Sequence, residues 1–562
     1  MMNRTLRFFL INSILLLSIQ GTAQTYAKNG MVVSSDRTSS EIGVEILKKG
    51  GNAIDAAIAT AFSLAVTHPA AGNIGGGGFI VFMNRDGKVT TLDFREKAPL
   101  AATPDMYLDD DGKVIEDSNH KTAKAIGVPG TVAGLYMAHQ KYGKLSWKEL
   151  VQPAIDQAEK GFPFNWSLYR AANRFHEQED GTEFMKNYFL TKKGTIPEPG
   201  DLWKQPQLAE TLKLIRDKGR DGFYKGSTAT KIASWMKENG GLITKKDLKK
   251  YEAIERKPIQ GNYKGYDIYS MPPPSSGGVV LVEMMNLMEL ADFKKAEFNS
   301  AAHLHLLIEA MRRAYADRAE HLGDPDFNPD IPIEKLTSKA FAQKRFAGID
   351  MSRASVSDST KYGHPYDGES TTHLSTMDKF GNAVSMTYTL EYSYGSKLGS
   401  TELGFIFNNE MGDFNPQPGI TNSRGQIGSQ PNLIAPEKRM LSSMTPTIVG
   451  KNGKPYLVIG SPGGRTIINT VFQTTLNVLE FEMRIDKAIE ALKIHHQWLP
   501  DQVVYEKDLL SPDTRKILES MGHTFRERYN MGALMGITYD SDKKLMTGAS
   551  DAAQPDSGAS GY

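Results

Sequence analysis

The sequence reads Gly368-Glu369-Ser370-Thr371-Thr372-His373-Leu374-Ser375 where a polar loop gives way to a predicted β-strand. Strand-like alternation runs from Thr371 to Met377, and a turn over Asp378 to Asn382 leads into a second strand from Ala383 to Leu390. β-Branched residues suit a pleated strand, so this stretch taken alone predicts a hairpin. Two hydroxyl groups at the head of a strand also make a candidate nucleophile.

A second hairpin is predicted further along the chain. Strands at Thr447 to Val449 and Tyr456 to Ile459 flank Asn452-Gly453, a strong hairpin signal. The segment Gly460-Ser461-Pro462-Gly463-Gly464 then leads into a helix predicted from about Arg465 to Leu479. The C-terminal part of the chain is therefore rich in strands, with helices between them.

The N-terminal part is rich in helices. Its glycine run, Gly72 to Gly78 with Asn73 and Ile74 inside it, leads into a strand and is not followed by Gly-Lys-Ser/Thr. We therefore expect close backbone packing there, and not a phosphate loop. Residues 130–350 have mainly helical patterns, and the whole predicts an α+β architecture. The clearest predicted helices are Ser39–Lys49, Asn52–Val66, Ser146–Lys160 (which Pro153 could kink or split) and Ala302–Ala319.

Composition excludes several classes of protein. The chain has 562 residues, 66 Lys and Arg against 65 Asp and Glu, and a formal net charge of +1. A nucleic-acid-binding protein usually carries a basic excess, so no nucleic-acid partner is expected. The absence of cysteine excludes disulfides, thiolate metal sites and cysteine nucleophiles. A nucleophile must then be Ser, Thr, Lys or a carboxylate.

The first 23 residues have the pattern of a secretory signal peptide. Arg4 and Arg7 precede a mainly apolar run from Phe8 to Ile19, and small residues lead up to a predicted cleavage after Ala23. An uncleaved anchor is the alternative, but the run is shorter than the ~20 residues that a spanning helix needs. A periplasmic or secreted protein, with no membrane contact after signal removal, is expected.

Two other kinds of site are weak candidates. His495-His496 lacks the spacing and the neighbouring acid of a helical zinc site, so a structural role is favoured and no metal is expected. No Gly-x-Ser-x-Gly elbow occurs, and Ser461, between Gly460 and Pro462, is a minor serine-hydrolase candidate.

Ordered motifs along nearly the whole chain identify a resemblance. The chain resembles the bacterial secreted γ-glutamyltranspeptidases, within the N-terminal-nucleophile hydrolases. The motifs are Gly50 to Ala57, Gly72 to Phe79, Asp93 to Glu96, Gly127 to Gly134, Tyr315 to Ala319, Ser370 to His373, Asn408 to Phe414, Leu441 to Pro446 and Gly460 to Gly464. The resemblance implies a four-layer αββα sandwich with two antiparallel sheets between layers of helices.

The resemblance also implies that the precursor cuts itself between Ser370 and Thr371. A large subunit, residues 24–370, and a small catalytic subunit, residues 371–562, would remain associated as one intertwined domain. Thr371 would be the nucleophile, and Thr389 matches the threonine that hydrogen-bonds it. A free α-amine, with a pKa of roughly 7.7–8.0, can act as the general base, whereas the uncut amide cannot take a proton.

The implied substrate is a γ-glutamyl amide such as glutathione, and the implied acceptors are water, amino acids or peptides. Arg95 matches the arginine that binds the α-carboxylate, and Ser442 and Ser443 match its hydroxyl partners. The family's α-amine ligands are matched by Glu410 and Asp413, and Glu391 is expected to join them. The oxyanion hole is matched by Gly463 and Gly464. No cofactor is implied.

Two alternatives stay open at this point. One is a glutaryl or cephalosporin acylase of the same superfamily, which would not need the three carboxylates because a glutaryl group has no α-amine. The other is a non-catalytic periplasmic binding protein. A further expectation concerns Pro418 to Ser429, which preserves the length of a lid loop but has Arg424 near the position where bacterial relatives often carry a tyrosine.

Overall fold

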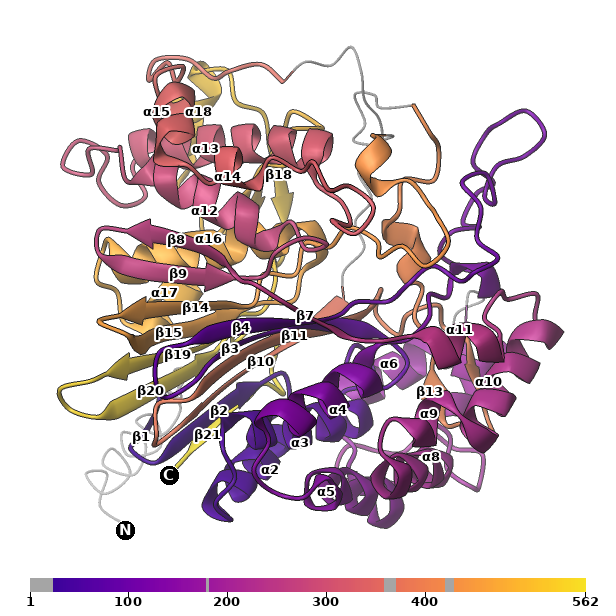
Figure 1. The fold of residues 1–562 in the computed structure, drawn as a ribbon. Helices are drawn as coiled ribbons and strands as arrows, with labels where there is room; N and C mark the ends of the chain where they lie inside the picture. Colours follow the sequence, from indigo (N-terminus) through magenta and orange to yellow (C-terminus); the bar gives the residue numbers. More distant parts are fainter. Residues whose placement is uncertain (1–23, 178–180, 358–369, 420–428) are drawn as a thin grey trace, which may run out of the picture.

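The computed structural model describes residues 24–177, 181–357, 370–419 and 429–562. Two seven-stranded sheets pack face to face, and helices cover the outer face of each (Figure 1). The expected four-layer αββα sandwich is confirmed. The proposed signal peptide and Arg424 lie outside the described residues.

The first sheet holds the hairpin with Thr371 at its centre. Strand β10 (Ser370–Asp378) pairs antiparallel with β11 (Ala383–Glu391). The strand order is β21-β2-β10-β11-β3-β4-β7, so both central strands have neighbours from the N-terminal part. These neighbours and the edge strands are β2 (Gly30–Ser34), β3 (Gly77–Met83), β4 (Val89–Phe94), β7 (Ile254–Arg256) and β21 (Gly558–Gly561).

The second sheet also combines distant parts of the chain. Its order is β1-β20-β19-β15-β14-β9-β8. The predicted hairpin around Asn452-Gly453 is confirmed as β14 (Thr447–Lys451) and β15 (Lys454–Gly460). The hairpin of β8 (Ile259–Tyr263) and β9 (Tyr266–Ser270) lies in a region that the sequence predicts as mainly helical. Each of the two strands is only five residues long, so few residues carry the strand pattern. The remaining strands are β1 (Thr25–Ala27), β19 (Met535–Asp540) and β20 (Leu545–Ser550).

One helical layer packs against the first sheet. The predicted N-terminal helices are confirmed as α2 (Arg37–Lys48) and α3 (Ala53–Thr67). Every residue of α3 is buried, and its six alanines allow neighbouring elements to approach closely. Helix α5 (Trp147–Lys160) remains one helix in spite of Pro153, with a capping box of Ser146 and Glu149. The other helices of this half are α4 (Thr131–Tyr142), α6 (Trp166–Glu177), α7 (Glu183–Tyr188), α8 (Pro206–Lys218), α9 (Asp221–Tyr224), α10 (Gly226–Glu238) and α11 (Lys245–Lys250).

The other helical layer covers the second sheet (Figure 1). It is built around α12 (Gly277–Met288), α13 (Ala301–His321) and α16 (Ile467–Leu479), which share one hydrophobic cluster with β14 and β15. Shorter elements complete the described fold: α14 (Ile333–Leu336), α15 (Lys339–Phe346), α17 (Ile485–Glu490), α18 (Pro512–Ser520), β5 (Phe162–Pro163), β6 (Leu202–Trp203), β12 (Gly399–Ser400), β13 (Phe405–Ile406), β16 (Ile494–His495), β17 (Val503–Glu506) and β18 (Phe525–Arg528).

The glycine run packs closely, as predicted, against the strand that carries Thr389. A Cβ on Gly76 would lie 1.9 Å from the carbonyl oxygen of Thr389. The side chain of Asn73 donates a hydrogen bond of 2.9 Å to the same carbonyl. A side chain at Gly76 would therefore collide with β11. The glycine run also holds the backbone of β11 in place beside the cavity described below.

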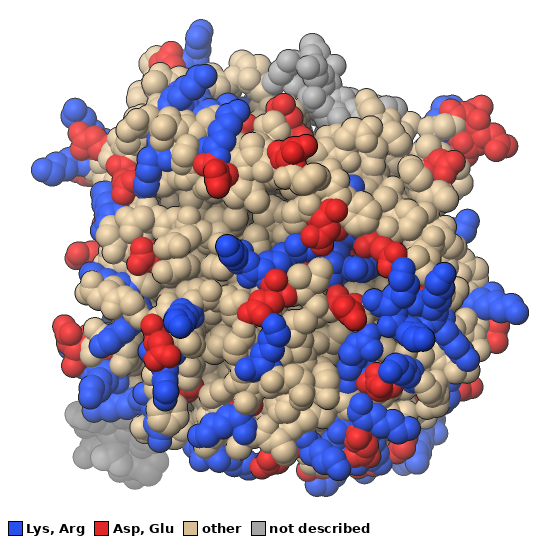
Figure 2. All heavy atoms as spheres, in the orientation of Figure 1, with Lys and Arg blue, Asp and Glu red and all other residues tan. Residues whose placement is uncertain are grey.

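The surface is mixed in charge. Figure 2 shows acidic and basic side chains interspersed over the visible face, in keeping with a formal net charge of +1. Within the described ranges, no helix combines the length and the hydropathy that crossing a bilayer would require.

Candidate active site

Thr371 and Thr389 face each other across β10 and β11. A register shift separates Ser370 from Thr371, and Thr371 pairs with Thr389. The Thr371 hydroxyl donates to the Thr389 hydroxyl at an oxygen–oxygen distance of 3.4 Å. The backbone N–H of Glu391 donates to the same Thr389 oxygen at 2.8 Å. Both threonines are buried, yet both reach the wall of one cavity.

That cavity has a volume of about 370 Å³. It gathers residues from both sides of Thr371 in the sequence, because the two sheets and the loops at their ends meet there. Nine of the ten residues predicted for the site line it, and Gly463 lies one residue away from the wall. The nine are Arg95, Thr371, Thr389, Glu391, Glu410, Asp413, Ser442, Ser443 and Gly464.

Arg95 is fully buried and is surrounded by carboxylates. Its guanidinium forms ion pairs with Glu410 and Asp413, and Nη1 lies 3.6 Å from the Glu96 carboxylate. Burial alone would lower the pKa of Arg95, but Glu410 and Asp413 outweigh it and raise that pKa. The predicted carboxylate-binding arginine and two predicted amine-binding acids thus satisfy one another when no ligand is bound.

Burial also changes the acids themselves. It raises the pKa of Glu96 to about 7, although the Arg95 charge acts in the opposite direction. Burial raises the pKa of Glu410 and of Glu391 well above the usual carboxyl range. The Asp413 side chain is 39% exposed and lines the cavity. Burial therefore favours the protonated form of Glu391 and Glu410, whereas a nearby cation favours the ionised form.

The two serines are fixed by their surroundings. The Ser442 hydroxyl accepts from the Met444 N–H at 3.1 Å, and its carbonyl accepts from the Ser276 N–H at 2.8 Å. The Ser443 hydroxyl accepts from Arg318 Nη2 at 3.0 Å. Since each hydroxyl oxygen already accepts a hydrogen bond and lines the cavity, each can donate its own hydrogen to a ligand carboxylate.

Gly463 and Gly464 form a turn before α16. Their φ angles are +134° and +54°, which favour glycine, and a Cβ on Gly463 would lie 2.7 Å from Thr466 Oγ1. Neither backbone N–H donates to another of the residues that the structure describes. Two such N–H groups beside a nucleophile can bind a developing oxyanion.

Several residues that line or support the site were not predicted. His120 lies 3.3 Å from the Glu391 carboxylate and stacks on Tyr392 with ring centroids 4.8 Å apart. Burial lowers the pKa of His120 to about 4, so it is neutral at neutral pH. No pattern in the loop around His120 signals this position. Arg318 and Glu96, in contrast, each belong to one of the motifs quoted above.

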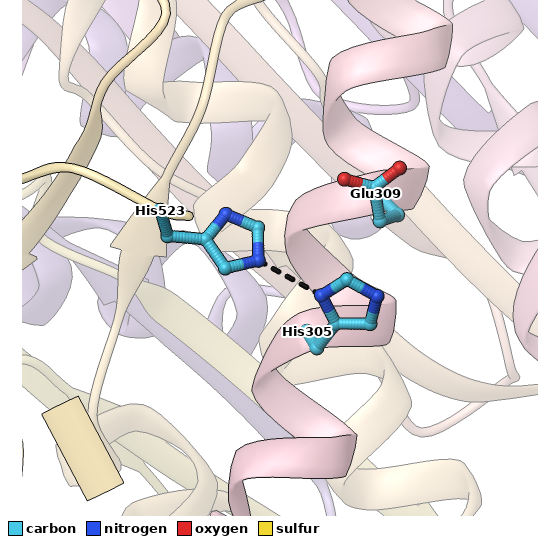
Figure 3. Close-up of side chains that lie close together, drawn as sticks. All are labelled: His305, Glu309 and His523. Atoms are coloured by element: carbon cyan, nitrogen blue, oxygen red, sulfur yellow. Dashed lines mark hydrogen bonds between the residues drawn. The ribbon is translucent and has the colours of Figure 1, made fainter. Parts of the chain in front are cut away.

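One group of side chains among the described residues has ligand atoms close enough for a metal: His305, Glu309 and His523 (Figure 3). His523 Nε2 and His305 Nδ1 are 2.8 Å apart and share a hydrogen bond. Glu309 accepts hydrogen bonds from Arg312 and from the backbone of Ser355. An arginine beside the carboxylate and a direct bond between the imidazoles fit a structural network better than a cation site.

The weaker candidates have structural roles as well. Asn469 donates to His495 at 2.7 Å, and His496 contacts Asp501 at 3.1 Å. The Ser461 hydroxyl donates to the carbonyl of Pro462 at 2.7 Å and accepts from the Ala533 N–H at 3.1 Å. Ser461 is fully buried and does not line the cavity, which removes it as a nucleophile.

Residues 39–561 match the family model of gamma-glutamyltranspeptidase. The chain is similar to the glutathione hydrolase proenzyme of Escherichia coli (strain K12), with 45% identity over 543 residues that cover 95% of this chain and 92% of that protein. It is similar to the glutathione hydrolase proenzyme of Bacillus subtilis (strain 168), with 39% identity over 94% of this chain and 90% of that protein.

Two solved structures are also similar. Cephalosporin acylase from Bacillus halodurans aligns with a TM-score of 0.83 and 26% identity, over 97% of this chain and 98% of that chain. The gamma-glutamyltranspeptidase of Helicobacter pylori aligns with a TM-score of 0.56 and 44% identity, over 60% of this chain and 95% of that chain.

Proposed function

Because this chain belongs to the γ-glutamyltranspeptidase family, we propose that Thr371 is the nucleophile with which it performs the family's reaction. The enzyme is made as a proenzyme, cleaves the γ-glutamyl amide bond of glutathione and related compounds, and passes the γ-glutamyl group to water or to an amine. The observation that carries the assignment of Thr371 is its direct pairing with Thr389 in a cavity walled by Arg95 and several acids.

Maturation supplies the general base. Before the cut, the Thr371 nitrogen is an amide and cannot accept a proton. Attack of the Thr371 hydroxyl on the Ser370 carbonyl forms an ester and breaks the Ser370–Thr371 C–N bond, which frees the α-amine of Thr371. Water then hydrolyses the ester, giving the Ser370 carboxylate and restoring the Thr371 hydroxyl. The amine has a pKa of roughly 7.7–8.0 and can take the hydroxyl proton in later turnovers. The self-cleavage therefore activates the enzyme.

The catalytic cycle is an acyl transfer. Thr371 Oγ1 attacks the γ-carbonyl carbon while the α-amine takes the hydroxyl proton. The backbone N–H groups of Gly463 and Gly464 stabilise the oxyanion of the tetrahedral intermediate, each worth roughly 3 kcal/mol. The C–N bond breaks, the leaving amine takes the proton, and a γ-glutamyl-Thr371 ester remains. Water or an acceptor amine then attacks the ester and restores the hydroxyl.

Recognition of the donor uses the charges in the cavity. The α-carboxylate binds Arg95 and the hydroxyls of Ser442 and Ser443, since a guanidinium matches a carboxylate in a bidentate geometry. The α-ammonium binds Asp413 and Glu410, with Glu391 beside them. These acids already pair with Arg95 in the free enzyme. A zwitterionic donor therefore inserts its own two charges between partners that are in place.

The two fragments remain one heterodimer. Strands β10 and β11, which follow the cut, lie between β2 and β3, which precede it, and all four share hydrophobic clusters. The Tyr388 hydroxyl donates to the Ala61 carbonyl at 3.0 Å across the two parts. The H. pylori chain aligns with 60% of this chain. Residues 24–370 make up a similar share of the sequence. The proposed location is the periplasm or the cell exterior, after removal of residues 1–23.

The acids separate this function from a glutaryl or cephalosporin acylase. A glutaryl donor lacks the α-amine, so Glu391, Glu410 and Asp413 would have no ammonium group of the donor to bind. The fold shared with the acylase from B. halodurans does not distinguish the two activities. The carboxylates favour the γ-glutamyl donor.

The test follows p-nitroaniline release from γ-glutamyl-p-nitroanilide and from glutaryl-p-nitroanilide, beside a denaturing gel. We expect two bands, an N-terminal threonine on the smaller one, and release from the γ-glutamyl donor alone. Thr371→Ala should remain a single band and release nothing. A smaller band that begins at a residue other than Thr371, or stronger release from the glutaryl donor, would contradict the proposal.

A further inference from the structure

Arg318 is a buried arginine on α13 that forms no ion pair with the acids that the structure describes. It is 8% exposed and lines the cavity with Thr371. No carboxylate of the described residues lies within ion-pair distance of its guanidinium, whereas Arg95, in the same cavity, has three. Burial and the nearby charge of Arg465 lower the pKa of Arg318 to about 10. It still carries its charge at neutral pH, and an unpaired buried charge is costly.

The side-chain hydrogen bonds of Arg318 connect it to Ser442 and Ser443. Nε donates to the Ser276 hydroxyl at 2.8 Å, and that hydroxyl donates to the Ser442 carbonyl at 2.7 Å. Nη2 donates to the Ser443 hydroxyl at 3.0 Å. One guanidinium therefore fixes the backbone of Ser442 through Ser276 and the side chain of Ser443 directly.

These contacts determine where the Ser443 hydrogen points. A guanidinium has only donors, so the Ser443 oxygen must accept from Arg318 and its hydrogen must be donated elsewhere. Ser443 lines the cavity, and the carbonyl of Leu441, two residues before it, accepts from Arg95 at 3.4 Å. The hydrogen is thus available to an anion in the cavity, on the wall that Arg95 also reaches.

We propose that Arg318 is a positioning residue for the donor's α-carboxylate, acting by directing the Ser443 hydroxyl into the cavity and by leaving one positive charge there uncompensated. The inference rests on the proposed function and deepens it, since it names the donor's α-carboxylate as the anion that binds near Arg318. Arg95 then binds the carboxylate directly in a bidentate geometry. Arg318 donates to the Ser443 oxygen and so strengthens the hydrogen bond that Ser443 donates to the carboxylate.

The experiment compares two donors, γ-glutamyl-p-nitroanilide and 4-aminobutyryl-p-nitroanilide, which keeps the amine but lacks the α-carboxylate. For Arg318→Gln we expect the KM of the first donor to rise by about tenfold to a hundredfold, the range for a hydrogen bond to a charged group, with a small change in kcat. The kcat/KM of the second donor should change less than threefold. Arg313→Gln, on the same helix and outside the cavity, should leave both donors unaffected.

A double-mutant cycle separates positioning from a general structural role. In the Ser443→Ala background, Arg318→Gln should raise the KM for the γ-glutamyl donor less than threefold, because the hydroxyl through which Arg318 acts is already absent. Equal losses on both donors, or the full loss in the Ser443→Ala background, would overturn the inference. If Arg318→Gln stays uncut on a gel, Arg318→Lys takes its place, with a smaller loss expected on the same donor alone.

The proposed function and this inference fail in different ways. Wild-type enzyme that releases nothing from γ-glutamyl-p-nitroanilide contradicts the proposed function, and the inference falls with it. Wild-type enzyme that is active while Arg318→Gln keeps its KM contradicts the inference alone.

Discussion

Thr371 and Thr389 are cross-strand partners whose hydroxyl oxygens lie 3.4 Å apart, with the Glu391 N–H donating to Thr389 at 2.8 Å. Thr389 is in turn held by its backbone, since the Asn73 side chain donates to its carbonyl. The nucleophile is thus oriented by a neighbour that is itself fixed from two sides. Its hydroxyl has a defined direction before the chain is cut.

The first prediction concerns Thr389. Replacing Thr389 by Val removes the hydroxyl that orients Thr371 while keeping the β-branched shape of the strand. We expect self-cleavage and turnover each to slow by tenfold or more, since a misoriented nucleophile loses the advantage of proximity. Thr389→Ser keeps the hydroxyl and should process at a rate close to wild type. Band conversion on a gel over time measures this, and equal rates for Val and Ser variants would contradict it.

The sequence could predict the hairpin and the ligand set but not how they are arranged. Strand alternation and Asn452-Gly453 are local signals, so both hairpins were predicted near their true bounds. The short β8–β9 hairpin was missed because few residues carry its signal. The pairing of Arg95 with Glu410 joins residues 315 positions apart. Such a contact, like that of His120 with Glu391, depends on tertiary packing that no local pattern contains.

The second prediction concerns the oxyanion hole. Gly463 has φ +134°, and an added Cβ would lie 2.7 Å from Thr466 Oγ1 and 3.1 Å from Gly532 Cα. Gly463→Ala must shift the turn and move both N–H groups. We expect kcat to fall by about 10²- to 10³-fold, the cost of one lost oxyanion donor, with KM within a few-fold of wild type. Gly453→Ala, at φ +73° in a distant turn, is the control for positive-φ strain. A fall in kcat of equal size in both variants would contradict the assignment.

The third prediction concerns pH and donor binding. Burial raises the pKa of Glu391 and of Glu410 well above the usual carboxyl range, so both bind protons more readily than exposed carboxylates do. A protonated carboxyl attracts the donor's ammonium group weakly. The KM for γ-glutamyl-p-nitroanilide should therefore fall as the pH rises above the usual carboxyl range. Glu391→Gln should raise the KM roughly tenfold at the upper end and flatten the profile. A profile of the same slope in the variant would show that Glu391 does not titrate in this step.

The fourth prediction concerns the buried imidazoles of Figure 3. Burial, with the nearby His305 and Arg312, lowers the pKa of His523 to about 4, against 6.5 for an exposed histidine. As pH falls below 6.5, His523 binds a proton in the unfolded chain but not in the native protein. His523 alone should thus lower the free energy of unfolding between pH 6.5 and 4, by roughly 3 kcal/mol at about 1.4 kcal/mol per pKa unit. His523→Gln should reduce this slope in urea denaturation series across that range, whereas His321→Gln, at a partly exposed position of α13, should keep it. Because Glu309 is occupied by Arg312 and Arg313, a chelator should not change the melting temperature. A drop with chelator, or an unchanged slope in His523→Gln, would refute this account of the cluster.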